Sequence, residues 1–308
     1  MKKRDALTDF GGVHTGEPLE VHRPETLAQL QDTVARCVRQ GRAMRARCFA
    51  HSMNGAAVPR PGEALIDLSR FRHLTWAPGG TITIGAGLAV WEVDQYVRRF
   101  GWKLPVVNDG GGPASSVGGF VSAGGIGEGC LFYGGFWETV RRLGLVLATG
   151  ALAEFARDDP RFPWVFGAMG GLGLIHEVSI DLVEIGEGGR LPVEPTPHLT
   201  PGPRPHWPDH IWLTLFVPPH ERDAARGALD ALSREFADAW RPRADYEYYL
   251  LRRRLVPPLV FGQDSDFLAV GMWGDRTERD LGASRYLALE QRFQGLVRER
   301  GWRRYFQS

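Results

Sequence analysis

The segment VGGFVSAGGIG, residues 117–127, lies at the centre of a glycine-rich region that extends from Gly85 to Gly173. The chain holds 39 glycines, and many of them are concentrated there. Glycine is costly inside helices and strands, so this density indicates turns or backbone that must approach a ligand closely. Regular patterning is absent between residues 108 and 135, and we expect a loop-like ligand site in this stretch.

Regular elements are predicted on both sides of this region. An amphipathic helix is expected between Pro24 and Gly41. Its apolar face would consist of Leu27, Leu30, Val34 and Val38. Short runs of good β composition predict strands at residues 44–49, 64–68, 81–85 and 140–147, with a helix at 90–101 and another strand ending near residue 183.

Composition limits the classes of partner. The chain has 308 residues, 43% of them hydrophobic, and a formal net charge of +1. Since no like-charge block occurs, we expect a small-molecule substrate or a protein partner, and neither nucleic acid nor a membrane. Three scattered cysteines indicate neither a disulfide framework nor a zinc site. No secretory leader or long apolar run is found, so we expect a cytoplasmic protein.

A change in composition predicts the domain boundary. Residues 188–207 are rich in proline and glycine, as linkers are. We expect a first domain at residues 1–187 and a second at 208–308. The second has the predicted order strand, helix, strand, strand, helix, strand, which is the ferredoxin-like arrangement. Tyr246, Tyr248 and Tyr249 lie along one of its predicted strands, where one face would either line a substrate pocket or pack within the sheet.

The glycine pattern does not predict a Rossmann fold. Residues 124–129, GGIGEG, match the glycine spacing of that fold only superficially. No apolar strand precedes them and no periodic helix follows, although the Rossmann motif requires both. A nest of backbone N–H groups is the alternative way to hold a pyrophosphate, and it fits this sequence better.

Five motifs in a fixed order carry a more specific resemblance. They are HSMNGA at 51–56, LIDLS at 65–69, ITIGAG at 82–87, the 117–127 segment continued by FYG at 132–134 and TVRRLGLVLATG at 139–150, and GGLGLI at 170–175. In this order they resemble the PCMH-type FAD-binding domain of the vanillyl-alcohol oxidase superfamily, and especially the cytokinin dehydrogenase-like flavin oxidoreductases. The resemblance implies an α+β fold, in which a two-subdomain FAD-binding domain is followed by a reduced ferredoxin-like cap.

The resemblance also implies which residues bind FAD. They are His51, Ser52, Asn54, Gly55, Ser116, Val117, Gly118, Gly119, Ser122, Gly124, Gly125, Gly127, Tyr133, Gly173 and Ile175. In many members the histidine equivalent to His51 bonds covalently to the flavin 8α carbon. A neutral imidazole is a competent nucleophile for such a bond. The alternative is an ordinary loop histidine that hydrogen-bonds a neighbour.

Two departures from the family pattern concern this loop. Where the family has Gly-x-Gly before His-Ser, this chain has Cys48-Phe49-Ala50, whose Cβ atoms would crowd the phosphates. The bicovalent subgroup has a cysteine just before Val117, where this chain has Ala114-Ser115-Ser116. We therefore expect at most one covalent bond to the flavin.

Asp109 is the candidate catalytic residue. Residues 104–109, LPVVND, resemble the segment of cytokinin dehydrogenases that ends in the catalytic aspartate. By resemblance, Asp109 would take a proton from the substrate as hydride leaves for flavin N5. The local alternative is an aspartate that begins a turn before three glycines.

The resemblance predicts an FAD-dependent oxidoreductase that oxidises a C–N or C–OH carbon of a small molecule. The chain is short for this class, so either the cap is minimal or a partner chain or second protomer completes the active site. Two alternatives stay open. One is a flavin reductase similar to the UDP-N-acetylenolpyruvoylglucosamine reductases, and the other is a redox-inactive flavin fold that acts as a scaffold or rearrangement catalyst.

Overall fold

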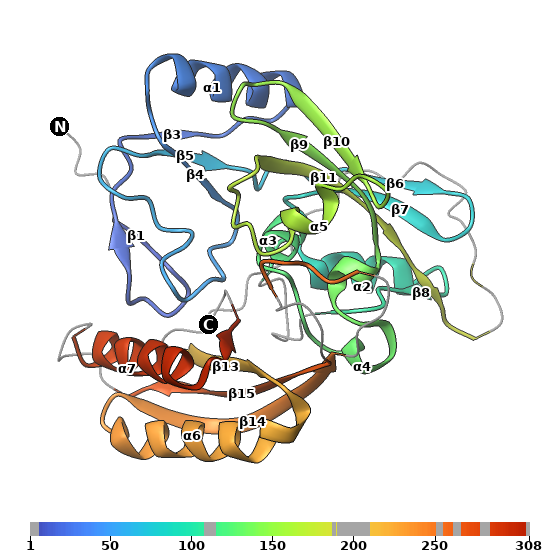
Figure 1. Cartoon of the computed structure of the whole chain (residues 1–308). Coiled ribbons are helices and arrows are strands. Elements are labelled where there is room, and N and C mark those ends of the chain that lie inside the picture. Colours follow the sequence, from blue (N-terminus) through green and yellow to red (C-terminus); the bar gives the residue numbers. More distant parts are fainter. Residues whose placement is uncertain are drawn as a thin grey trace.

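The computed structural model describes residues 6–107, 115–186, 189, 210–250, 255–260, 266–277 and 284–305, and it has an α+β architecture (Figure 1). Two sheets and their helices form the N-terminal part. A third sheet with two helices forms the C-terminal part, which lies below the others in Figure 1. Among the described residues, none of the helices combines the length and apolar character that crossing a membrane requires.

The first sheet is parallel and carries one helix. Its strands are β3 (Glu20–His22), β5 (Ala64–Asp67) and β4 (Met44–Arg47), in that spatial order. The predicted helix is α1 (Leu27–Arg39), and the side chain of Thr26 caps it by accepting a bond from the N–H of Gln29. The prediction that Val38 belongs to the apolar face is wrong, because Val38 is 46% exposed. Cys37 is buried instead.

The second sheet is antiparallel and has five strands. Their spatial order is β10 (Leu152–Ala156), β9 (Val140–Val146), β11 (Leu174–Asp181), β7 (Thr81–Gly85) and β6 (Leu74–Ala77). Helix α2 (Val90–Arg98) follows β7 and buries Val93 and Val97 in the core of this sheet. The smaller elements are β1 (Leu7–Thr8), β2 (Thr15–Gly16), β8 (Trp102–Lys103), α5 (Phe162–Val165) and β12 (Val183–Glu184).

The stretch between residues 115 and 138 contains short helices, so the expectation of a continuous loop is wrong there. The helices are α3 (Val117–Ser122), α4 (Cys130–Tyr133) and the 3-10 turn η1 (Phe136–Glu138). Helix α3 forms despite two glycines, because Ser116 caps it and accepts a bond from the N–H of Gly119. Residues 108–114 lie outside the described part of the chain.

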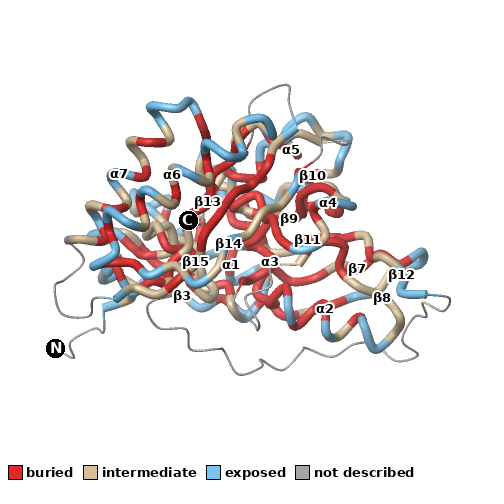
Figure 2. The backbone as a smooth tube through the Cα atoms, turned by 90° about the horizontal axis from the view of Figure 1, so that it is seen from below, coloured by how far each residue is buried: buried red, intermediate tan, exposed pale blue. Residues whose placement is uncertain are grey.

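The C-terminal sheet has the spatial order β14 (Trp240–Leu250), β15 (Phe267–Arg276), β13 (His210–Val217) and β16 (Arg303–Arg304), with antiparallel neighbours throughout. A 3-10 turn, η2 (Pro219–Glu221), leads into helix α6 (Arg222–Glu235), and α7 (Ser284–Arg300) precedes the last strand. Alternate residues of β13, beginning with Ile211, share one core with both helices. In Figure 2 much of β13 and β15 is buried, whereas α6 and α7 expose their outer sides.

The N-terminal and C-terminal parts share their cores. Phe216 and Val260 pack into the core of the five-stranded sheet, and Met53 packs into the core of the C-terminal sheet. The predicted linker at residues 188–207 lies outside the described residues except for Gly189. The boundaries at residues 187 and 208 therefore stay a prediction, although contacts bind the two parts closely.

Candidate functional site

A cleft opens where three loops from the two N-terminal sheets meet. They are the segment after β4, the start of α3, and the turn that leads into β11. The cleft encloses about 790 Å³, counting the part open to solvent. It is lined by Ala46, Arg47, Cys48, Phe49, Ala50, His51, Ser52, Ala56, Ala57, Leu68, Ala86, Ser115, Ser116, Gly118, Gly119, Ser122, Ala123, Met169, Gly170, Gly173, Leu174 and Ile175.

All five sequence motifs contribute to this cleft, since Leu68 of residues 65–69 and Ala86 of residues 82–87 also line it. The residues that were predicted to bind FAD and that line it are His51, Ser52, Ser116, Gly118, Gly119, Ser122, Gly173 and Ile175. They come from segments up to 124 positions apart, since the first is His51 and the last is Ile175. The fold thus places the ordered glycine motifs around one space.

The other predicted residues do not line the cleft. They are Asn54, Gly55, Val117, Gly124, Gly125, Gly127 and Tyr133. Several of them have a packing role. A Cβ on Gly124 would lie 2.4 Å from Val260, and one on Gly125 would lie 2.5 Å from the ring of Phe120. Asp109 is outside the described residues.

The glycines of α3 allow close packing and do not present free N–H groups. The N–H groups of Val117 and Gly118 donate to the carbonyls of Leu88 and Ala86, at 2.8 and 3.0 Å. A Cβ on Gly118 would lie only 2.7 Å from the Cβ of Ala86. The expected nest of free N–H groups therefore does not lie at this helix.

Such a nest lies in the loop after β4. Ala50 has a φ of +55°, in the left-handed region that glycine favours. The backbone N–H groups of Ala50, His51 and Ser52 donate no hydrogen bond to any described residue, and all three residues line the cleft. Successive N–H groups beside a left-handed residue form a concave site for an anion. The loop thus forms a left-handed turn at Ala50 although it carries Cys48 and Ala50 in place of two glycines.

His51 is packed between two aromatic rings from distant segments. The ring centroid of Phe10 lies 4.6 Å from that of His51, and the centroid of Trp212 on β13 lies 4.9 Å away. Burial, with a smaller contribution from His210, lowers the pKa of His51 to about 4. The imidazole is therefore neutral at physiological pH, as a nucleophile must be.

Two buried polar atoms in this loop have no protein partner among the described residues. They are Nδ1 of His51 and the hydroxyl of Ser52, a residue that is only 9% exposed. Buried polar groups are nearly always hydrogen-bonded, so unmatched ones at a cleft indicate a bound group that completes them. The residues present therefore fit a polar cofactor.

A buried carboxylate holds the same loop in place. Asp9 accepts backbone bonds from Val13 at 3.0 Å and from His14 and Gly55 at 3.3 Å. Burial raises the pKa of Asp9 above its usual value. The ring of His14 lies 3.8 Å from Asp9 and 3.5 Å from Glu290 on α7, and its interaction with Glu290 raises the pKa of His14.

Sequence reasoning missed the side chains that reach this loop from elsewhere. Phe10, Trp212 and Arg47 had no motif to mark them, because their proximity depends on the tertiary fold. Met169 also lines the cleft and has a φ of +50°, which is unusual for a residue with a side chain. Its position directly before Gly170 was the available signal, since glycine turns often include a second left-handed residue.

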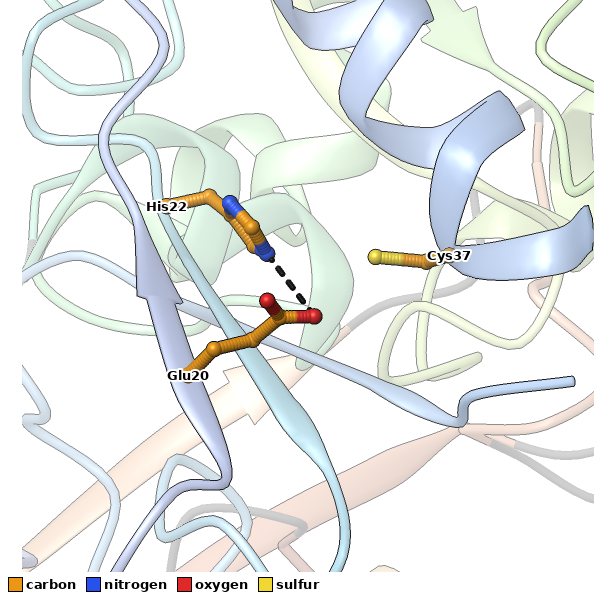
Figure 3. Close-up of side chains that lie close together, drawn as sticks. All are labelled: Glu20, His22 and Cys37. Carbon is orange, nitrogen blue, oxygen red and sulfur yellow. Dashed lines mark ion pairs between the residues drawn. The ribbon is translucent and has the colours of Figure 1, made fainter. Parts of the chain in front are cut away.

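One group of potential metal ligands lies outside the cleft, at Glu20, His22 and Cys37 (Figure 3). Their ligand atoms lie within 4.8 Å of one another. However, Arg42 forms an ion pair with Glu20, and a guanidinium nitrogen of Arg36 lies 2.9 Å from Nδ1 of His22. Burial also raises the pKa of the Cys37 thiol. Two guanidinium groups and a protonated thiol disfavour a cation, so we interpret this group as an ion-pair cluster.

Comparison with known proteins gives a family match that agrees with a cofactor site at the cleft. Residues 18–156 match a protein family described as an FAD binding domain. This match agrees with the resemblance of the glycine motifs to the PCMH-type FAD-binding domains of the vanillyl-alcohol oxidase superfamily. The resemblance derived from the glycine motifs is thereby confirmed, and the cofactor of this domain is FAD.

Three curated relatives are oxidoreductases by name. Alditol oxidase from a Streptomyces species is 32% identical over 187 residues, which cover 60% of this chain and 44% of the relative. An uncharacterised oxidoreductase from the fasciation locus of Rhodococcoides fascians is 27% identical over 60% of this chain and 42% of its own. L-galactono-1,4-lactone dehydrogenase 2 of rice is 27% identical over 58% of this chain and 30% of its own. The chain thus spans less than half the length of each of these three relatives.

Proposed function

We propose that this FAD-binding protein oxidises a carbon that bears a hydroxyl group on a small, hydroxyl-rich molecule. The observation that carries the proposal is the cleft, where residues from all five motifs of an FAD domain meet. FAD, when bound, supplies an acceptor that takes hydride at N5. The substrate would lose that hydride and one proton and become a carbonyl compound, and oxygen or another acceptor would reoxidise the flavin.

Hydroxyl oxidation is favoured over amine oxidation by the names of the relatives. Alditol oxidase and L-galactono-1,4-lactone dehydrogenase both refer to compounds rich in hydroxyl groups. We retain Asp109 as the proposed proton acceptor, on the resemblance of residues 104–109 alone.

We propose that the C-terminal part is a ferredoxin-like cap that covers the reacting end of the flavin. Its order β13-α6-β14-β15-α7-β16 and its antiparallel sheet support that arrangement. One face of the sheet is covered by α6 and α7, and the opposite face is turned toward the FAD-binding part, where Trp212 contacts His51. The same face carries the half-buried rings of Tyr246, Tyr248 and Trp273. Rings with a polar tip suit a substrate that offers both C–H and O–H groups.

We also propose that His51 forms the single covalent bond to the flavin. Its buried Nδ1 without a partner and its lowered pKa support this assignment. The aromatic contacts with Phe10 and Trp212 would hold the imidazole in one orientation for the attack.

The substrate class is tested by anaerobic reduction of the bound flavin. Alditols, lactones and primary amines would each be mixed with the holoprotein while the flavin absorbance is followed. We expect bleaching by a hydroxyl compound and none by amines, and we expect Asp109→Asn to slow bleaching without releasing FAD. Bleaching by amines alone, or by none of the compounds, would reject the proposed substrate class. Unchanged kinetics in Asp109→Asn would remove Asp109 from the mechanism.

A further inference from the structure

A turn at residues 9–14 lies between the cofactor loop, residues 48–55, and the C-terminal part of the chain. The N–H of Asp9 donates to the carbonyl of His14 at 3.2 Å and closes the turn. The N–H of Phe10 donates to the carbonyl of Ser52 in the cofactor loop at 3.1 Å. On the other side, Val13 packs into the core of the C-terminal sheet. The turn thus connects the cofactor loop to that sheet.

Asp9 fastens this turn to Gly55 of the cofactor loop. One carboxylate oxygen of Asp9 accepts backbone bonds from Val13 and His14, and the other accepts a bond from Gly55 at 3.3 Å. Gly55 has a φ of +72°, and a Cβ added to it would lie 3.0 Å from Cγ of His14. Gly55 was predicted to bind FAD but does not line the cleft. It is instead the point at which Asp9 and His14 contact the loop.

His14 places one ring nitrogen between two carboxylates. Its Nε2 lies 3.8 Å from the oxygen of Asp9 that accepts from Gly55, and 3.5 Å from an oxygen of Glu290 on α7. The side chain of Asp9 is fully buried, and that of Glu290 is 13% exposed. Opposite charges attract strongly where water is largely excluded, so a protonated His14 draws the two carboxylates together. One carboxylate belongs to the N-terminal part of the chain and the other to the C-terminal part.

The surroundings of His14 favour its charged form. The pKa of His14 is raised, chiefly by Glu290 and also by Asp9, although partial burial acts against them. Burial raises the pKa of Asp9, and the charge of His14 opposes this effect. The other titratable or charged groups that act on this cluster are Arg304 on β16, Tyr286 on α7 and Arg276 on β15.

The direction of this pKa change fixes the pH range in which the contact is strongest. The ordinary pKa of histidine is 6.5. A histidine whose pKa is raised on folding contributes its full stabilisation below the ordinary value, and this contribution is lost as the pH rises through the raised value. The contact between His14 and the two carboxylates therefore weakens as the pH rises above 6.5.

We propose that His14 is a positioning residue of the FAD site, whose imidazolium holds the cofactor loop in the shape that binds FAD. The residue does not line the cleft, and it acts through Asp9 and Gly55. The inference rests on FAD binding at the cleft and adds a residue that no sequence motif marks. When His14 loses its proton, the buried carboxylate of Asp9 loses a facing positive charge and takes up a proton more readily. A neutral carboxyl group is a weaker acceptor for the N–H of Gly55, so the loop is held less firmly.

The test measures the dissociation constant of FAD on apoprotein over a pH series on both sides of 6.5, the ordinary pKa of histidine. All proteins would carry His51→Asn, so that no covalent bond forms and binding stays reversible. We expect the affinity of this reference to fall about fivefold or more as the pH rises, a change typical of coupling between two sites. By the same linkage, FAD binding should take up protons near the midpoint of this change. Calorimetry in buffers of different ionisation enthalpy measures that uptake.

Two variants separate the charge of His14 from its packing. His14→Gln keeps an N–H near the position of the ring nitrogen but cannot be protonated. It should bind FAD at every pH about as weakly as the reference does at high pH, without the pH dependence. Glu290→Gln keeps the imidazole but removes the carboxylate that raises its pKa most. The midpoint of the pH dependence should therefore move to lower pH.

His220→Gln is the matched control, because the side chain of His220 on η2 is 80% exposed and does not line the cleft. This variant should leave both the FAD affinity and its pH dependence unchanged. Thermal unfolding followed by circular dichroism at each pH shows whether each variant is folded.

Several results would overturn the proposal for His14. A reference whose FAD affinity is the same across the pH series would contradict it. If His14→Gln weakens binding but retains the pH dependence, the residue only supports the turn. If His14→Gln does not fold, Glu290→Gln decides, because an unchanged midpoint contradicts the role of the cluster. A reference that binds no FAD at any pH would reject the cofactor assignment, and the proposal with it.

Discussion

At the scale of single residues, the environment of His51 decides how the flavin is held. The ring is held between Phe10 and Trp212, and burial lowers its pKa to about 4. A histidine whose pKa is lowered on folding is neutral in the native state above that value. The imidazole is therefore neutral throughout the physiological range.

The covalent bond is tested by acid precipitation of the purified holoprotein. Because neutral His51 lines the cleft, we expect the yellow colour to remain in the protein pellet. The variant His51→Asn should bind FAD but release its colour into the supernatant. A white pellet from the native chain would contradict the tether and leave the cofactor assignment intact.

Ala50 shows why the altered phosphate loop still forms. A residue with a Cβ in the left-handed region costs about 1–2 kcal/mol, which explains the glycine at this position in the family. Here Ala50 adopts a φ of +55° and is 7% exposed, so packing holds it there. The crowding expected from the missing glycines has therefore not abolished the turn.

At the scale of elements, α3 shows how glycine serves the site. Gly118 lies against Ala86, where an added Cβ would come within 2.7 Å of another Cβ. This close approach brings the start of α3, with Ser116 and Gly119, to the edge of the cleft. The lack of a side chain at Gly118 thus allows α3 to lie directly against Ala86 and fixes the position of this helix.

Substitution of this glycine separates packing from helix propensity. Gly118→Ala should lower the free energy of unfolding by about 1–3 kcal/mol, because the new methyl group overpacks a rigid contact. Gly227→Ala on α6 is the matched control, since nothing lies within 4 Å of its Cβ position. It should raise stability by about 0.5–1 kcal/mol. Urea unfolding measures both, and equal effects in the two variants would contradict the packing role.

The longer elements could be predicted from the sequence, whereas the shorter ones depend on tertiary contacts. The helices predicted from their apolar periodicity are present as α1, α2 and α6. Each of them has enough apolar positions to define one face. Helices α3 and α4 could not be predicted, because their six and four residues are too few to show a helical period. These helices form through caps and packing. At the site, the glycine turns were marked by composition. No sequence pattern indicated Trp212, although its backbone N–H donates to the sulfur of Met53, 159 positions earlier in the chain.

At the scale of the whole molecule, the C-terminal part helps to build the cofactor loop. Met53 is fully buried in the core of the C-terminal sheet, and the N–H of Trp212 lies 3.3 Å from its sulfur. From the other side, Asp9 and His14 connect the loop to Glu290 on α7. The loop between β4 and β5 is therefore held by both parts of the chain. This arrangement supports the proposal that the cap and the flavin site act as one unit.

The central claim is that the cleft between the two N-terminal sheets holds FAD, and the most direct test is the binding stoichiometry of the purified chain. The absorption spectrum of the isolated protein, followed by titration of any apoprotein with FAD, measures it. We predict flavin absorption bands and saturation at one FAD per chain. A colourless protein that takes up no added FAD would contradict the account.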